Sequence, residues 1–121
     1  MFITKEYLRE NQNCIFVYGD NTIHKGTGGA AKLRYEPNTY GFVTKKYPSN
    51  EISSFFTIEE YFSVFEKELE KLIKKIESNP DKIFLISKLG SGLANRYGIF
   101  EQIIFPGLKR LAIYKNVKFL F

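Results

Sequence analysis

Two glycine-rich segments carry the residue types that could do chemistry. The first, FVYGDNTIHKGTGGAAKLR at residues 16–34, places Asp20 and Asn21 directly before a run of glycines. The second, KLGSGLANRYG at residues 88–98, also follows an apolar run. Glycine has no Cβ, so backbone N–H groups in such segments can approach phosphate oxygens, and a following helix N-terminus adds a favourable dipole. Two converging loops of this kind are suited to hold the two phosphates of a pyrophosphate.

The familiar phosphate-binding motifs do not fit either segment. No G-x-x-x-x-G-K-[ST] pattern follows Gly19, and GTGGAA departs from the dinucleotide pattern G-x-G-x-x-G. Each loop taken alone is better explained as a structural turn, and Asp-Asn pairs are common turn residues. The occurrence of two such loops, each after a strand, is the feature that indicates a ligand.

The elements that must position these loops alternate between strands and helices. Short apolar runs at residues 14–18 and 83–87 are typical of buried strands. Thr57 and Glu60 form a capping box that starts an amphipathic helix ending before Asn79. The whole pattern predicts helices at 4–11, 57–78 and 99–115, further strands at 40–47 and 116–121, and a helix after the first loop that stops before Pro37. Such alternation predicts one α/β layered domain, residues 1–121, with its sheet covered on both faces.

Composition narrows the function classes. The single cysteine, Cys14, excludes an internal disulfide and is expected to be a buried hydrophobic residue. We find no membrane-spanning run, signal sequence, metal-ligand cluster or indication of a cofactor, and expect a cytoplasmic protein. The net charge of +5 suits an anionic partner, although lysines on solvated helix faces explain it equally well.

The two loops together resemble those of a macrodomain, the ADP-ribose-binding fold. In that family a strand ends in Asn before a loop of glycines and small residues, as at Asn21 and residues 26–31 here. A later apolar strand leads into a loop of the form I-G-x-G-L, which LGSGL at residues 89–93 is similar to. The resemblance implies a three-layer α/β/α macrodomain-like fold with a central mixed sheet.

The middle of the chain resembles one branch of that family, the small glycohydrolases that remove terminal ADP-ribose from acidic side chains, and a related branch that acts on DNA. The catalytic lysine of the branch stands in a T-K-K-like strand end, which matches Lys45. The branch pairs this lysine with an Asp directly after its second loop, where this chain has Ala94. The resemblance implies Lys45 as catalytic residue, and Asp20 is the candidate general base in place of the missing Asp.

The ligand implied by the resemblance sets the remaining expectations. The diphosphate would lie between the two loops, the distal ribose would face Asn21, and Tyr97 or Phe100 would stack on the adenine. The candidate binding residues are Asn21, Gly26, Thr27, Gly28, Gly29, Ala30, Ala31, Gly90, Ser91, Gly92, Leu93 and Tyr97. His24, Arg34 and Arg96 are expected to be bystanders or surface charges.

Three functions remain open at this point. The first is an enzyme that binds ADP-ribose and hydrolyses ADP-ribosyl linkages on protein or nucleic acid, favoured by Lys45. The second is a non-catalytic module that senses or sequesters ADP-ribose or an NAD-derived signalling nucleotide, favoured by Ala94. A basic nucleic-acid-binding domain is the weakest, because the aromatic residues fall on apparent core faces. The oligomeric state cannot be inferred from the sequence.

Overall fold

The computed structural model describes residues 2–121, which are built around a four-stranded sheet. The strands are β1 (Cys14–Asn21), β2 (Thr39–Lys45), β3 (Ile83–Ile86) and β4 (Val117–Phe119). Their order is β2-β1-β3-β4, and every neighbouring pair is parallel. The predicted α/β class is therefore confirmed, but the predicted mixed sheet is wrong. Each pair of consecutive strands is joined by a helical crossover, which returns the chain to the same end of the sheet.

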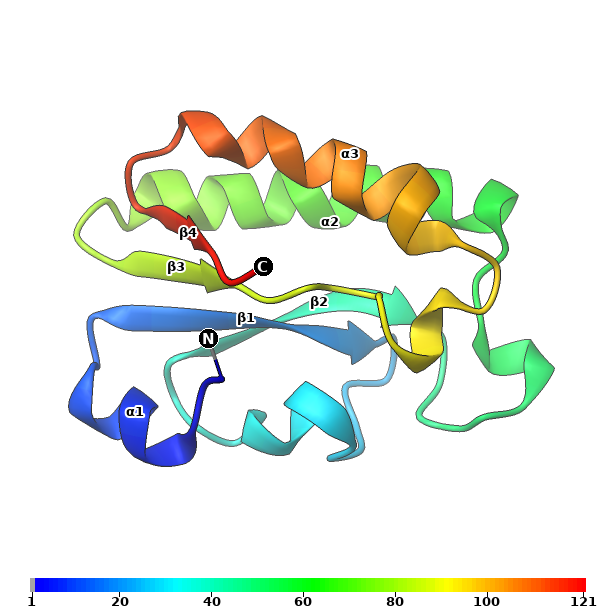
Figure 1. Cartoon of the computed structure of the whole chain (residues 1–121), viewed down its shortest axis with the longest axis horizontal. Coiled ribbons are helices and arrows are strands. Elements are labelled where there is room, and N and C mark those ends of the chain that lie inside the picture. Colours follow the sequence, from blue (N-terminus) through cyan, green and yellow to red (C-terminus); the bar gives the residue numbers. More distant parts are fainter. Residues whose placement is uncertain (1) are drawn as a thin grey trace.

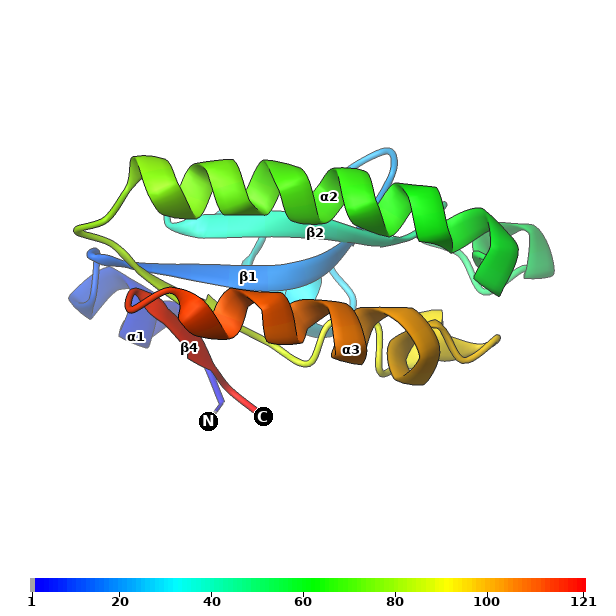
Figure 2. The same ribbon diagram turned by 90° about the horizontal axis from the view of Figure 1, so that it is seen from above.

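Helices cover both faces of the sheet. The long helix α2 (Ile58–Ser78) and the segment containing α3 (Phe105–Leu108) lie on one face. The short helix α1 (Lys5–Glu10) and the 3-10 helix Gly29–Leu33 lie on the other (Figure 1). Viewed from above, α2 and α3 run side by side along the strands (Figure 2).

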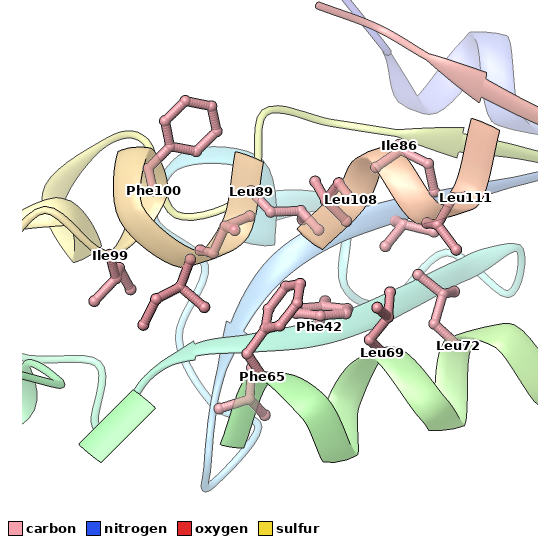
Figure 3. Packing of buried hydrophobic residues seen from close by; sticks show 14 of the residues in the cluster. Phe42, Phe65, Leu69, Leu72, Ile86, Leu89, Ile99, Phe100, Leu108 and Leu111 are labelled. Carbon is pink, nitrogen blue, oxygen red and sulfur yellow. The ribbon is translucent and has the colours of Figure 1, made fainter. Parts of the chain in front are cut away.

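The larger part of the core fills the space between the sheet and these two long helical segments. The predicted capping box at Thr57 and Glu60 is present, and α2 then buries a stripe of apolar side chains. Phe65 packs against Phe42 of β2 with ring centroids 5.7 Å apart (Figure 3). Most of the largest fully buried side chains belong to this face, to which both helical segments contribute.

A smaller apolar cluster occupies the opposite face. Cys14, Phe16 and Tyr18 alternate along β1 and pack against Leu8 and Leu33. Cys14 is buried, as predicted. Asp20 continues this alternation, so the strand places a carboxylate at the end of an apolar row.

Several predicted boundaries differ from the structure. β1 continues through Gly19 to Asn21, because these residues still pair with β2. The helix expected after the first loop is one 3-10 helix of five residues, and the segment after the second loop begins with a 3-10 turn at Leu93–Asn95. The predicted helix 99–115 is a π-helix (Phe100–Ile104), then α3 with Pro106 in its first turn, then a 3-10 helix (Lys109–Ile113). The segment between β2 and α2 contains the 3-10 helix Ile52–Ser54.

The topology contains one switch point. β1 and β3 are neighbours in the sheet. From β1 the chain crosses over to β2 on one side, and from β3 it crosses over to β4 on the other side. In open parallel sheets, ligands bind outside the carboxyl ends of strands at such a point. The segments that follow β1, β2 and β3 gather at this end of the sheet (Figure 1). Within residues 2–121, no helix has both the length and the apolar character to cross a membrane.

Candidate functional site

A cleft of about 650 Å³ opens at the carboxyl ends of β1, β2 and β3. Its walls come from three segments: residues 19–31, residues 44–50 and residues 87–94. This volume is within the range of small-molecule sites. The cleft coincides with the switch point of the sheet, so fold and cavity indicate the same place.

Most of the predicted binding residues line this cleft. They are Asn21, Gly26, Thr27, Gly28, Gly29, Ala30 and Ala31 from the first loop, and Gly90, Gly92 and Leu93 from the second. Asp20 and Lys45 line it as well. Ser91 and Tyr97 do not: the Ser91 hydroxyl donates to the Lys88 carbonyl at 2.8 Å, and Tyr97 lies against Arg96. Phe100, the other candidate for adenine stacking, is buried in the core.

Both loops present backbone donors that the protein itself does not use. Within residues 2–121, the N–H groups of Gly28, Gly29 and Ala30 have no hydrogen-bond acceptor. The same holds for Gly92, Leu93 and Ala94 in that part of the chain. The 3-10 helices that follow are too short to add a helix dipole of consequence. The cleft therefore has two groups of unused N–H donors, which an anionic ligand can satisfy.

The first loop is held by a buried ion pair. The Arg34 guanidinium lies 2.7 Å from Asp20 Oδ1, and the two side chains are only 7% and 2% exposed. Arg34 also donates to the carbonyls of Gly26 and Lys25, at 2.9 and 3.1 Å. The prediction that Arg34 is a surface charge is wrong. Because it bonds both the strand end and the loop, Arg34 fixes where the glycines lie.

The Asp20 carboxylate is fully engaged. Oδ1 also accepts from the Asn21 amide at 2.8 Å, and Oδ2 lies 2.7 Å from His24 Nδ1. Burial favours a higher pKa for Asp20, but the hydrogen bonds from Arg34, His24 and Asn21 outweigh it and hold the pKa below its usual value. Gly41 on β2 makes room for this group, since a Cβ there would lie 2.4 Å from Asp20 Oδ2. These contacts make Asp20 a weak base and favour a positioning role over the predicted role of general base.

Asn21 and His24 shape the turn that follows β1. The Asn21 side chain donates to the Lys25 carbonyl at 2.7 Å and accepts from the Ile23 amide at 3.2 Å. His24 has a positive φ of 55° and directs its ring back to Asp20. In this conformation the Asn21 side-chain amide forms hydrogen bonds within its own loop, and it is not directed at a ligand ribose as predicted. His24 is part of the hydrogen-bond network around Asp20.

Lys45 and Lys46 are neighbours with different surroundings. Lys46 pairs with Glu60 at 2.7 Å. Lys45 lines the cleft with its Nζ 5.0 Å from the centre of the Phe55 ring, and no carboxylate within residues 2–121 pairs with it. Burial lowers the pKa of Lys45, which increases the fraction of neutral amine. Of the two lysines, Lys45 therefore has the environment of a reactive amine.

The charge balance of the cleft is positive. Lys25, Lys45 and Lys88 line it, and its one carboxylate, Asp20, is neutralised by Arg34. Across residues 2–121, no three His, Cys, Asp or Glu side chains are grouped closely enough to hold a metal ion. The groups available to a ligand thus include ammonium groups and backbone N–H donors, which suit phosphate oxygens.

Residues 1–96 match the family of unknown function DUF7831. The chain belongs to this family. No curated protein and no solved structure matches the chain. The part that matches DUF7831 contains every residue that lines the cleft, whereas α3 and β4 lie outside it.

The sequence contains a signal that Asp20 needs a partner, although it does not identify Arg34 as that partner. Asp20 shares one face of the strand with Cys14, Phe16 and Tyr18, all of which belong to the core. A carboxylate at the end of a buried row needs a cation or several donors. The extension of β1 through Gly19 and Asp20 was not predicted, so this requirement was not recognised.

Proposed function

We propose that the cleft binds ADP-ribose, or a related nucleotide with a diphosphate, and that the protein hydrolyses ADP-ribosyl linkages on protein or nucleic acid. The observation that carries the proposal is the convergence of the two glycine loops and Lys45 on one cleft at the switch point. The unused N–H groups of Gly28–Ala30 and Gly92–Ala94 would donate hydrogen bonds to the oxygens of the two phosphates.

Lys45 supplies the nucleophile in this proposal. Its neutral amine attacks the anomeric carbon of the distal ribose while the bond to the target oxygen breaks, and that oxygen leaves with the electron pair. The proton of the resulting ammonium passes to the departing oxygen. Water then breaks the C–N bond of the lysine–ribose adduct, placing its OH on the anomeric carbon and its proton on the lysine nitrogen, which releases free ADP-ribose and restores the amine. The lowered pKa of Lys45 supports this role, and Asp20 acts by holding the first loop rather than as a base.

The test compares the two adjacent lysines. Purified protein is incubated with ADP-ribosylated protein and with ADP-ribosylated DNA, and free ADP-ribose is measured. Lys45→Ala is expected to slow release by about a hundredfold or more, in the range for loss of a central catalytic group. Lys46→Ala removes a partly exposed ion pair and should stay within about twofold of the wild type. Release by Lys45→Ala within about twofold of wild type would end the lysine mechanism.

One observation favours the second candidate, a non-catalytic module that binds ADP-ribose without cleaving it. Ala94 lines the cleft at the position where the branch it resembles has an Asp. Such a module would bind ADP-ribose with micromolar affinity and release none from any substrate. Calorimetric titration with ADP-ribose before the hydrolysis assay separates the two functions.

A further inference from the structure

A second cavity of about 480 Å³ adjoins the cleft on the α1 face of the sheet. Its walls are mainly apolar side chains: Phe2, Ile3, Phe16, Leu33 and Leu120. The beginning and the end of the chain lie side by side here in both views (Figures 1 and 2). The cavity is thus formed where the first residues and the segment after β4 meet the 3-10 helix Gly29–Leu33.

This apolar pocket shares a wall with the cleft. Gly29, Ala30, Ser87 and Lys88 line both cavities. Two of these residues, Gly29 and Ala30, also present unused backbone N–H groups. A phosphate bound to those N–H groups would therefore sit at the junction, with the rest of its ligand free to extend in either direction.

The two cavities differ in the chemistry that they offer. The cleft has lysines and N–H donors, whereas the pocket has aromatic and aliphatic walls, with Lys32 and Lys88 as its charged residues. Phe2 is 76% exposed, and its ring is 4.9 Å from Lys32 Nζ. An exposed aromatic ring beside a buried Phe16 is an arrangement on which a planar aromatic group can stack.

We propose that this apolar pocket binds the aromatic base of the nucleotide whose phosphates occupy the cleft. The inference rests on the proposed function, because it assumes a nucleotide diphosphate in the cleft. It replaces Tyr97 and Phe100 as the base contacts, since neither lines the cleft or the pocket. The ligand would extend from the pocket across Gly29 and Ala30, with its reactive ribose toward Lys45.

The test measures the affinities of ADP and inorganic pyrophosphate by calorimetry. The base makes ADP the tighter ligand of wild-type protein. Phe2→Ala should weaken ADP about tenfold, as expected for loss of one stacking side chain, and leave pyrophosphate within about twofold. Phe62→Ala is the matched control, because Phe62 is 58% exposed on α2, across the sheet from the pocket. It should change neither affinity.

The outcomes separate this inference from the proposed function. If ADP and pyrophosphate bind equally well, or if Phe2→Ala binds ADP as wild type does, the base pocket is overturned and the phosphate cleft stands. If wild-type protein binds neither, both are overturned. If Phe2→Ala alters self-association and leaves ADP affinity unchanged, the pocket is a protein contact and the inference fails.

Discussion

The loops after β1 and β3 border the same cleft but are held in place by different forces. The first is held by charge and hydrogen bonds, through Asp20, Asn21 and Arg34. The second forms no ion pair within residues 2–121 and is held mainly by packing: Leu89 is 1% exposed, and Gly90 lies against Ile104. The first loop should therefore respond to charge and pH, and the second to side-chain volume.

Removal of the Arg34 guanidinium should have the largest effect on the free energy of unfolding. Arg34→Met leaves the Asp20 carboxylate buried without its cation, which is expected to lower the free energy of unfolding by about 3–5 kcal/mol. Urea denaturation measures the loss. Arg9→Met is the control, because Arg9 is 64% exposed in its ion pair with Glu36 and should cost less than about 1 kcal/mol. Similar losses in the two variants would contradict a special role for Arg34.

A methyl group added at Gly90 in the second loop should have the next largest effect on stability. Gly90 has a φ of +70°, and a Cβ there would lie 2.5 Å from Ile104 Cδ1. Gly90→Ala is expected to lower the free energy of unfolding by about 1–3 kcal/mol, through strain and overpacking. Gly28→Ala is the control, because its backbone is extended and no neighbour lies within 4 Å of the added Cβ; it should stay within about 0.5 kcal/mol of wild type.

The steric part of that effect can be isolated with a double variant. Ile104→Val removes the Cδ1 atom that the new methyl group would meet. Gly90→Ala combined with Ile104→Val should therefore lose less stability than the sum of the single losses. Strictly additive losses would show that the second loop is not held by this contact.

The smallest expected effect is the loss of stability when acid protonates Asp20. The folded-state pKa of Asp20 is below the ordinary value of 3.8, so its contribution to stability is complete above that pH. The contribution is lost as the pH falls through the folded-state pKa. Unfolding free energies of wild type and Asp20→Asn, measured from about pH 7 to about pH 2, should converge at the acid end. Curves that stay parallel would contradict the assigned role of the carboxylate.

The sequence predicted the parts of the fold that depend on local patterns. The capping box and apolar spacing of α2, the buried run of β1 and the short helix α1 all depend on residues close together in the chain. The mixed sheet came from the family resemblance and is wrong. Helices that alternate with continuously apolar strands are typical of a parallel sheet, and the strand arrangement in the structure agrees with this pattern.

The site was only partly predictable, because its geometry depends on contacts between distant residues. Glycine loops after two strands marked the place, since parallel strands bring their carboxyl ends to one edge. The pairing of Asp20 with Arg34 joins residues on separate elements, and Gly41 matters only because β2 lies beside β1. Nothing in the local sequence distinguishes Arg34 from an exposed arginine.

The central claim is that both loops bind one diphosphate ligand, and an NMR titration with ADP-ribose tests it most directly. The amide resonances of Gly28, Gly29 and Ala30 and those of Gly92, Leu93 and Ala94 report on the two groups of unused donors. We predict that both groups shift together with one dissociation constant, while amides at the opposite end of the sheet, such as those of Lys82 and Asn116 just before β3 and β4, stay unchanged. Shifts confined to one loop, or to neither, would contradict the claim.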